Sequence, residues 1–192
     1  MKIPPFKLER YFARYEFTAP YLLSCSDCEP LSQNELLSMI HGETMKMWNV
    51  LTLGYTESQG HPQLREEVSK LYSTVAPEQV MVAAPEEAIF IAMNTLLGEG
   101  DEVIVTFPGY QSLYEVARST RCKLRFWEPR YEIGWYFETG DLEKLLTSRT
   151  KMLIINFPHN PTGAVISSKQ QQQIIKLVHE SGAMLFSDEM SC

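Results

Sequence analysis

The sequence has no apolar run that approaches the length of a membrane-spanning helix, which needs roughly 18 to 20 residues. Its first residues also lack the continuous apolar stretch of a signal peptide. Neither a membrane protein nor a secreted protein is therefore expected. The default expectation is a cytoplasmic protein that has no membrane as a partner.

Cysteine is scarce as well, because the chain has four, of which only Cys25 and Cys28 form a C-x-x-C pair. A zinc site would need a second such pair or histidines at metal-ligand spacing. The four histidines of this chain stand far apart in sequence. We therefore interpret the cysteines as reduced thiols and expect no metal site.

Basic residues are outnumbered, with 17 lysines and arginines against 24 acidic residues and a formal net charge of -7. The chain has no run of lysine or arginine that could neutralise the phosphates of a nucleic acid, so nucleic acid is not an expected partner. Hydrophobic residues make up 44% of the chain and charged residues 21%, a composition that is typical of a packed domain.

From about residue 80 onward, short apolar runs rich in β-branched residues alternate with segments of helical periodicity. This alternation is typical of βαβ units, in which helices cover both faces of a mostly parallel sheet. The sequence therefore predicts the α/β class, in the form of an α-β-α sandwich. The expected strands are residues 80–84, 102–107, 124–128, 152–156 and 184–188.

Local signals mark the ends of two expected helices. Ser168 followed by Gln171 fits a capping box at the start of one helix, and Gly182 fits the left-handed stop at its end. Upstream, Pro62 suits the first turn of another helix. The apolar face expected for that helix is made of Leu64, Val68, Leu71 and Tyr72.

In an open α/β sheet, ligands bind at the carboxyl ends of the strands, so the residues after each expected strand are candidates for a site. Glu86 and Glu87 open a helix whose free backbone N–H groups could hold a phosphate. Tyr110 follows the second strand, Asn160 follows the fourth, and Asp188 ends the fifth. Each feature alone also has a structural interpretation as a turn former, a packing residue or a helix cap. Together they would suit a phosphorylated aromatic cofactor.

Two motifs make the pattern more specific. Residues 160–163 read Asn-Pro-Thr-Gly, and residues 54–65 contain Tyr-(four residues)-Gly-(three residues)-Leu-Arg. With these motifs the chain resembles the N-terminal half of the class I/II, fold-type I aminotransferases, and it looks most like the branch that contains capreomycidine synthase. The resemblance implies an N-terminal arm with part of a small domain at residues 1–43. It also implies an incomplete large cofactor-binding domain, without its last strands, at residues 44–192.

The resemblance implies pyridoxal 5'-phosphate as the cofactor and roles for individual residues. Tyr55 would reach across a homodimer interface to the partner's cofactor phosphate, and Tyr110 would stack on the pyridine ring. Asn160 would hydrogen-bond the phenolic oxygen of the cofactor, and Asp188 would pair with the ring nitrogen. An anionic Asp188 would keep that nitrogen protonated, so that the ring withdraws electrons from the substrate Cα. The implied substrates are an amino acid and a 2-oxo acid.

The sequence departs from the family pattern in three places. No lysine follows Lys176, whereas the family has a lysine beyond the aspartate that binds the cofactor covalently, so we expect this chain alone to lack transaminase activity. Ser191 stands where the family usually has a tyrosine. At the phosphate turn, Pro85 offers no N–H and Glu86 adds a negative charge. Phosphate binding by the amides of Glu86 and Glu87 would therefore be weakened.

Alternative functions remain open at this point. One is a truncated, non-catalytic protein that pairs with a full-length subunit, which the missing lysine favours. Another is a pyridoxal-phosphate-dependent elimination or cyclisation enzyme, because the resembled branch includes such reactions. A nicotinamide-binding Rossmann domain is disfavoured, since no G-x-G-x-x-G follows the first expected strand.

Overall fold

The computed structural model describes residues 3–24 and 28–190. Within these ranges the chain forms two compact units. Residues up to Leu22 and those from Pro85 onward make up the first unit, and residues from Leu23 to Ala84 make up the second. The division expected from the family resemblance, between residues 43 and 44, stays a prediction.

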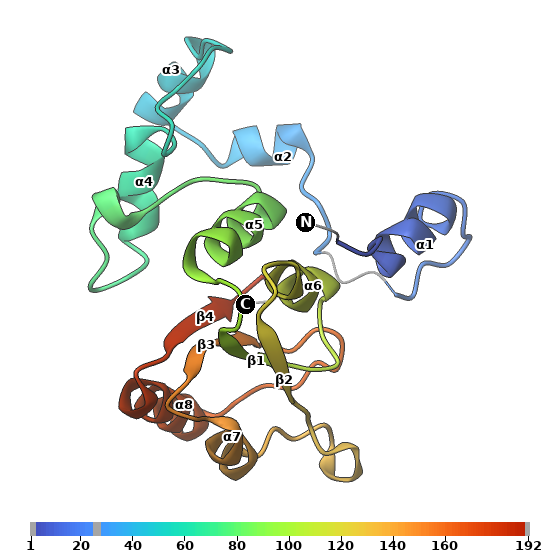
Figure 1. Cartoon of the computed structure of the whole chain (residues 1–192). Coiled ribbons are helices and arrows are strands. Elements are labelled where there is room, and N and C mark those ends of the chain that lie inside the picture. Colours follow the sequence, from blue (N-terminus) through green and yellow to red (C-terminus); the bar gives the residue numbers. More distant parts are fainter. Residues whose placement is uncertain (1–2, 25–27, 191–192) are drawn as a thin grey trace. The chain divides into compact units, whose positions relative to one another are not determined.

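A parallel sheet forms the centre of the first unit (Figure 1). All its neighbouring strands are parallel, and their order across the sheet is β2-β1-β3-β4. Four of the five expected strands are therefore confirmed, with ends within two residues of the expected ones. The strands are β1 (Glu102–Thr106), β2 (Lys123–Trp127), β3 (Thr150–Asn156) and β4 (Met184–Asp188).

Helices cover both faces of this sheet. On one face, Met93 of α5 (Pro85–Leu96) and Val116 of α6 (Gln111–Ser119) pack with Val103 and Val105 of β1. On the other face, α7 (Thr139–Leu145) and α8 (Ser168–Ser181) pack against Ile104 and its neighbours. The expected α/β class and α-β-α sandwich are thus confirmed.

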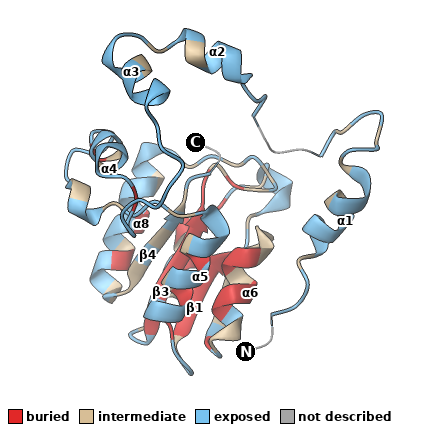
Figure 2. Ribbon diagram, turned by 90° about the horizontal axis from the view of Figure 1, so that it is seen from above, coloured by how far each residue is buried: buried red, intermediate tan, exposed pale blue. Residues whose placement is uncertain are grey.

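The two central strands carry most of the core. Every residue of β1 is buried, and in β3 only Lys151 is exposed (Figure 2). Strands that are buried on both faces lose all contact with water, which explains why their sequences are nearly continuous apolar runs. The first unit also contains α1 (Lys7–Tyr15), which has no buried residue, and the short helix η2 (Tyr131–Ile133).

The start of α8 differs by one residue from the prediction. Its cap is Ser167, whose side chain accepts the N–H of Gln170, while the Gln170 side chain accepts the N–H of Ser167. The expected pair of Ser168 and Gln171 was therefore wrong. Two adjacent serines precede a run of four glutamines, so both registers satisfy the capping-box pattern in sequence. The left-handed stop at Gly182 is confirmed, with φ of 72°.

The second unit is helical. It contains the three α-helices α2 (Gln33–Ser38), α3 (Glu43–Asn49) and α4 (Pro62–Ser69) and the short helix η1 (Pro77–Gln79). Pro62 opens α4 as predicted. The expected apolar face was partly wrong, because α4 ends at Ser69 and leaves Leu71 and Tyr72 beyond it, both exposed.

The expected strand at residues 80–84 is also absent from the described part of the chain. Its backbone is satisfied in another way, since the N–H of Val82 donates to the carbonyl of Gln59 at 2.8 Å. The Arg65 side chain holds the carbonyls of Pro77 and Val80. An apolar run becomes a strand only when a neighbouring strand pairs with its backbone, and none of the strands in the described ranges pairs with these residues.

None of the helices in the described ranges is long and apolar enough to cross a membrane.

Candidate functional site

Three of the predicted site residues come together at the carboxyl edge of the sheet, on the face covered by α5 and α6. Phe186 packs into the core on that face, and side chains of a strand alternate, so Asp188 projects to the same side. Ile154 likewise packs there, which places Asn156 on this side at the end of β3. Tyr110 precedes α6, and Glu86 lies in the first turn of α5.

Tyr110 is held by its hydroxyl group. The hydroxyl donates a hydrogen bond of 2.6 Å to Oε1 of Glu86. Burial, this hydrogen bond and the negative charge of Glu86 raise the pKa of Tyr110 well above its usual range, and Asp188 adds to the effect. The phenol therefore stays neutral and presents a flat aromatic ring beside the two carboxylates.

Asp188 is a half-buried carboxylate among other acids. Burial raises the pKa of Asp188, and the charges of Glu86 and Glu189 raise it further, while the N–H of Met190 opposes them through a 3.2 Å hydrogen bond. No cationic side chain forms an ion pair with Asp188 in residues 3–24 and 28–190. An anion in such a place gains from a cationic ligand, and a protonated ring nitrogen is one that fits.

Asn156 joins two of the predicted residues, although the sequence did not single it out. Its Nδ2 donates to the backbone carbonyl of Asp188 at 3.0 Å, and its Oδ1 accepts the N–H of Asn160 at 2.7 Å. Asn156 is only 2% exposed, so it relies on these two hydrogen bonds rather than on water to satisfy both ends of its amide. One signal could have revealed it, namely a single amide at the end of the apolar run of β3.

The turn after β3 is built around a buried histidine. Nδ1 of His159 lies 2.7 Å from Oγ1 of Thr162, and its backbone N–H donates to the carbonyl of Ala164. The ring contacts Phe137 edge-on, with centroids 4.7 Å apart. Burial lowers the pKa of His159 to about 4, although the nearby carbonyl of Pro108 favours the protonated form. His159 is therefore a neutral packing residue that shapes the loop of Asn160.

Gly109 allows the loop before Tyr110 to pass close to the end of β1. A Cβ at this position would lie 2.8 Å from the backbone carbonyl oxygen of Thr106. The same Cβ would approach the carbonyl oxygen of Asn160, at 4.0 Å. Only glycine permits this approach without a shift of the backbone.

The start of α5 fits a phosphate only in part. The N–H groups of Glu86 and Glu87 belong to the first turn, where no intrahelical acceptor exists, and they form no hydrogen bond within the described ranges. Such groups bind anions. However, Pro85 has no N–H, and the carboxylate of Glu86 sits beside Tyr110. The start of α5 therefore offers amide donors for a phosphate, but the carboxylate of Glu86 would repel it.

One predicted site residue, Tyr55, lies outside the first unit. Tyr55 belongs to the second unit, where its side chain is fully exposed, and its role across a dimer interface stays a prediction. Ser191, at the position where the family usually has a tyrosine, lies outside the described residues. Of the C-x-x-C pair, Cys25 is also outside them, whereas Cys28 is exposed.

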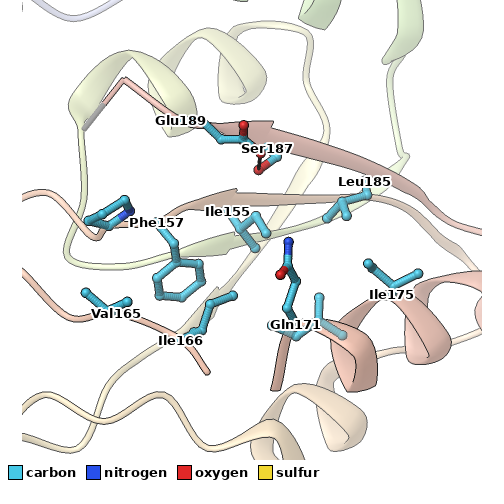
Figure 3. Close-up of a pocket in the computed structure, with 11 residues that line it drawn as sticks. Ile155, Phe157, Val165, Ile166, Gln171, Ile175, Leu185, Ser187 and Glu189 are labelled. Carbon is cyan, nitrogen blue, oxygen red and sulfur yellow. Dashed lines mark hydrogen bonds between the residues drawn. The ribbon is translucent and has the colours of Figure 1, made fainter. Parts of the chain in front are cut away.

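A separate hollow of about 560 Å³ lies between α8 and the exposed side of β4 (Figure 3). Leu185 and Ser187 project into it, on the side of the sheet opposite to Asp188. Its lining is mostly apolar, and its polar groups are Gln171 and the hydrogen-bonded pair Ser187 and Glu189. The hollow is therefore distinct from the candidate site.

Residues 33–190 match the model of the family described as aminotransferase class I and II. The chain belongs to this family. Members of the family depend on pyridoxal phosphate, so the expected cofactor is confirmed. Which residues of this chain hold the cofactor stays a prediction.

Among curated relatives of this chain, capreomycidine synthase of Streptomyces vinaceus is 35% identical over 132 residues, which are 68% of this chain and 34% of the relative. Aspartate aminotransferase of Sulfurisphaera tokodaii is 31% identical over 147 residues, which are 71% of this chain and 36% of the relative. The chain thus spans about a third of the length of these relatives.

Solved structures share the fold over nearly the whole chain. A PLP-dependent aminotransferase from Streptococcus suis superposes with a TM-score of 0.88 at 32% identity, over 98% of this chain and 52% of that one. The PLP-dependent cyclase OrfR superposes with a TM-score of 0.81 at 26% identity, over 98% of this chain and 49% of that one. The expected likeness to fold-type I enzymes is therefore confirmed.

Proposed function

We propose that this chain forms the cofactor-holding half of an enzyme that transfers an amino group between an amino acid and a 2-oxo acid. The observation that supports the proposal most strongly is the half-buried Asp188, which lies near Tyr110 and the acids Glu86 and Glu189 and forms no ion pair within the described residues. Pyridoxal phosphate, when bound, supplies a cationic conjugated ring that withdraws electrons from the substrate Cα.

Each residue of the site has a separate task in this proposal. Asp188 holds a proton on the ring nitrogen by its negative charge. Tyr110 covers one face of the ring, and Asn160 donates from its side-chain amide to the phenolic oxygen. The N–H groups of Glu86 and Glu87 hold the phosphate at the start of α5. Asn156 keeps Asn160 and Asp188 at a fixed separation through its two hydrogen bonds.

The proposal assigns no lysine of these residues to covalent binding of the cofactor, and Lys176 shows why. Lys176, the last lysine of the sequence, lies on α8, 3.7 Å from Glu180 and exposed, and α8 covers the face of the sheet opposite to Asp188. A lysine in this role also moves the proton at the substrate Cα, and losing such a general acid–base costs about 10² to 10⁴ in rate. We therefore propose that these residues by themselves are inactive.

We also propose that the enzyme is a homodimer. Members of the family are typically dimeric. The exposed Tyr55 suits a residue that serves a second copy, because an aromatic hydroxyl can donate to a phosphate oxygen. A homodimer in which Tyr55 completes the neighbouring site is the arrangement that we propose.

A second reaction of the same site is elimination or cyclisation. It is favoured by the relatives, since one is named a capreomycidine synthase and one neighbouring structure is a PLP-dependent cyclase that covers 98% of this chain. All of these reactions begin by withdrawing electrons from the same Cα, so the residues at the sheet edge serve each of them. Product analysis of the full-length enzyme by mass spectrometry, with and without a 2-oxo acid acceptor, separates them.

The experiment that tests the proposal is a titration of the chain with pyridoxal phosphate, followed by the circular dichroism induced in the cofactor absorption band. We expect saturable binding that Asp188→Asn weakens. Glu143→Gln, an exposed acid on α7, which covers the opposite face of the sheet, is the matched control. Binding that is insensitive to Asp188→Asn, or no induced signal at all, would refute the proposed site.

A further inference from the structure

The side chain of Gln111, at the start of α6, forms hydrogen bonds with the backbone of residues 5 and 7. Nε2 of Gln111 donates to the backbone carbonyl of Pro5 at 3.0 Å, and Oε1 of Gln111 accepts the backbone N–H of Lys7 at 3.0 Å. Both ends of the Gln111 amide are therefore used, and both partners are backbone groups that flank one residue. All of these residues belong to the first compact unit.

The residue between the two fastened backbone groups is Phe6. Its ring meets the ring of Tyr110 edge-on, with centroids 4.9 Å apart and an interplanar angle of 72°. Edge-to-face contacts of this kind are a favoured arrangement of aromatic pairs. The amide of Gln111 thus fixes the backbone on both sides of Phe6. Phe6 in turn contacts Tyr110, which directly precedes Gln111 in the chain.

Tyr110 is consequently restrained at three points. Its hydroxyl is bound to Glu86, its ring edge contacts Phe6, and its backbone carbonyl accepts the N–H of Leu113 at the start of α6. A side chain that is already fixed loses less conformational freedom when a ligand stacks on it. The contact with Phe6 is the one that depends on a segment more than a hundred residues away in the sequence.

We infer that Phe6 is a positioning residue. The two hydrogen bonds of Gln111 hold Phe6 against Tyr110, and this contact orients the Tyr110 ring for stacking on the cofactor. The inference rests on the proposed function, because it assumes that Tyr110 meets the pyridine ring. Phe6 itself acts only through Tyr110. Residues 5–7 thereby join the proposed site, although the sequence motifs point to no residue before Tyr55.

The first test measures the dissociation constant of pyridoxal phosphate for variants of the chain, by induced circular dichroism. We expect Phe6→Ala and Gln111→Leu each to weaken binding by roughly threefold to tenfold. Phe6→Tyr should restore it, since the edge-to-face contact is kept. Leu8→Ala is the matched control, because Leu8 is an exposed apolar residue of the adjacent helix.

A double-mutant cycle distinguishes positioning from a general loss of structure. In a Tyr110→Ala background, Phe6→Ala should change the dissociation constant by less than about twofold, because the group through which Phe6 acts is gone. An equal loss in both backgrounds would overturn the inference while leaving the proposed function intact. Equal binding by the Phe6→Ala variant and the unaltered chain would do the same.

The second test needs no variant and therefore holds even if a substitution prevents folding. Because coupling is reciprocal, binding of pyridoxal phosphate must slow amide hydrogen exchange at Lys7, whose N–H is bound to Gln111. Saturable binding with unchanged exchange at Lys7 would overturn the inference alone. Absence of any binding by the unaltered chain would overturn the inference and the proposed function together.

Discussion

The hydroxyl of Tyr110 lies 2.6 Å from Oε1 of Glu86, a residue 24 positions earlier in the chain. Glu86 belongs to the first turn of α5, so its carboxylate lies where the free N–H groups would otherwise favour a bound anion without opposition. The negative charge of Glu86 also raises the pKa of Asp188. Glu86 therefore acts on both the phosphate end and the ring-nitrogen end of the proposed site.

Removing this charge should tighten cofactor binding. Glu86→Gln keeps an oxygen that can accept from Tyr110 but eliminates repulsion of the phosphate, and we expect affinity for pyridoxal phosphate to rise by roughly threefold to tenfold. Affinity for unphosphorylated pyridoxal should change less. The measurement is the ratio of the two dissociation constants. Glu87→Gln removes an equal charge from the same turn. Because no hydrogen bond to Tyr110 holds the Glu87 carboxylate at the site, we expect a smaller gain in affinity for this variant.

Asp188→Asn should have opposite effects on stability and on binding. Burial raises the pKa of Asp188 above its unfolded value, so the native state binds more protons between the two pKa values and the free energy of unfolding falls as pH rises through that window. The neutral amide avoids this penalty, so the ligand-free variant should melt at a higher temperature at neutral pH. Its affinity for pyridoxal phosphate should fall by roughly tenfold to a hundredfold, since a hydrogen bond to a charged group is lost.

Thermal unfolding with and without the cofactor measures both effects of Asp188→Asn. The Asn side chain can still accept the N–H of Met190, so local structure should be kept. A variant that is less stable in both states would show that Asp188 has a structural rather than a cofactor-binding role.

His159 should make the fold sensitive to mild acid. Burial lowers the pKa of His159 to about 4, against 6.5 when unfolded, so the unfolded state binds more protons between these pH values. The free energy of unfolding should therefore fall by up to about 3 kcal/mol as pH drops from above 6.5 to about 4. Urea unfolding across this range should show a shallower pH dependence for His159→Asn. The exposed His179→Asn should behave like the unaltered chain.

Loss of the Asn156 amide should disturb two site residues at once. Asn156→Ala leaves the N–H of Asn160 and the carbonyl of Asp188 without their partner, and we expect a loss of roughly 1–3 kcal/mol of stability together with weaker cofactor binding. Asn94→Ala is the control, because Asn94 also bonds a backbone carbonyl but is exposed on α5. Comparable losses in the two variants would contradict a special role of Asn156.

Gly109→Ala should shift the loop that carries Tyr110. The added Cβ would lie 2.8 Å from the backbone oxygen of Thr106, which cannot rotate away, so we expect about 1–3 kcal/mol of destabilisation and weaker cofactor binding. Gly140→Ala in α7 meets nothing within 4 Å and should instead stabilise the helix by up to about 1 kcal/mol. Chemical unfolding of both variants is the measurement, and an unchanged Gly109→Ala variant would show that the loop is pliable.

The sequence by itself determined the class of the fold and singled out several candidate site residues. The apolar runs of β1 and β3 are long enough to identify buried strands, and Gly182 ends its helix because a left-handed residue is a local requirement. Motif spacing identified Tyr110 and Asn160 as candidates. Such features depend on neighbours in the chain, so they can be read without the fold.

Tertiary structure alone decided what depends on partners far away in the chain. Residues 80–84 have the composition of a strand but pair with no strand in the part of the chain that the structure describes, so their backbone bonds go elsewhere. The contact of Phe6 with Tyr110 and the bridge from Asn156 to Asp188 join residues that no periodicity connects. Hydrogen bonds and ring contacts are short-range, so whether they form depends on positions that only the folded chain defines.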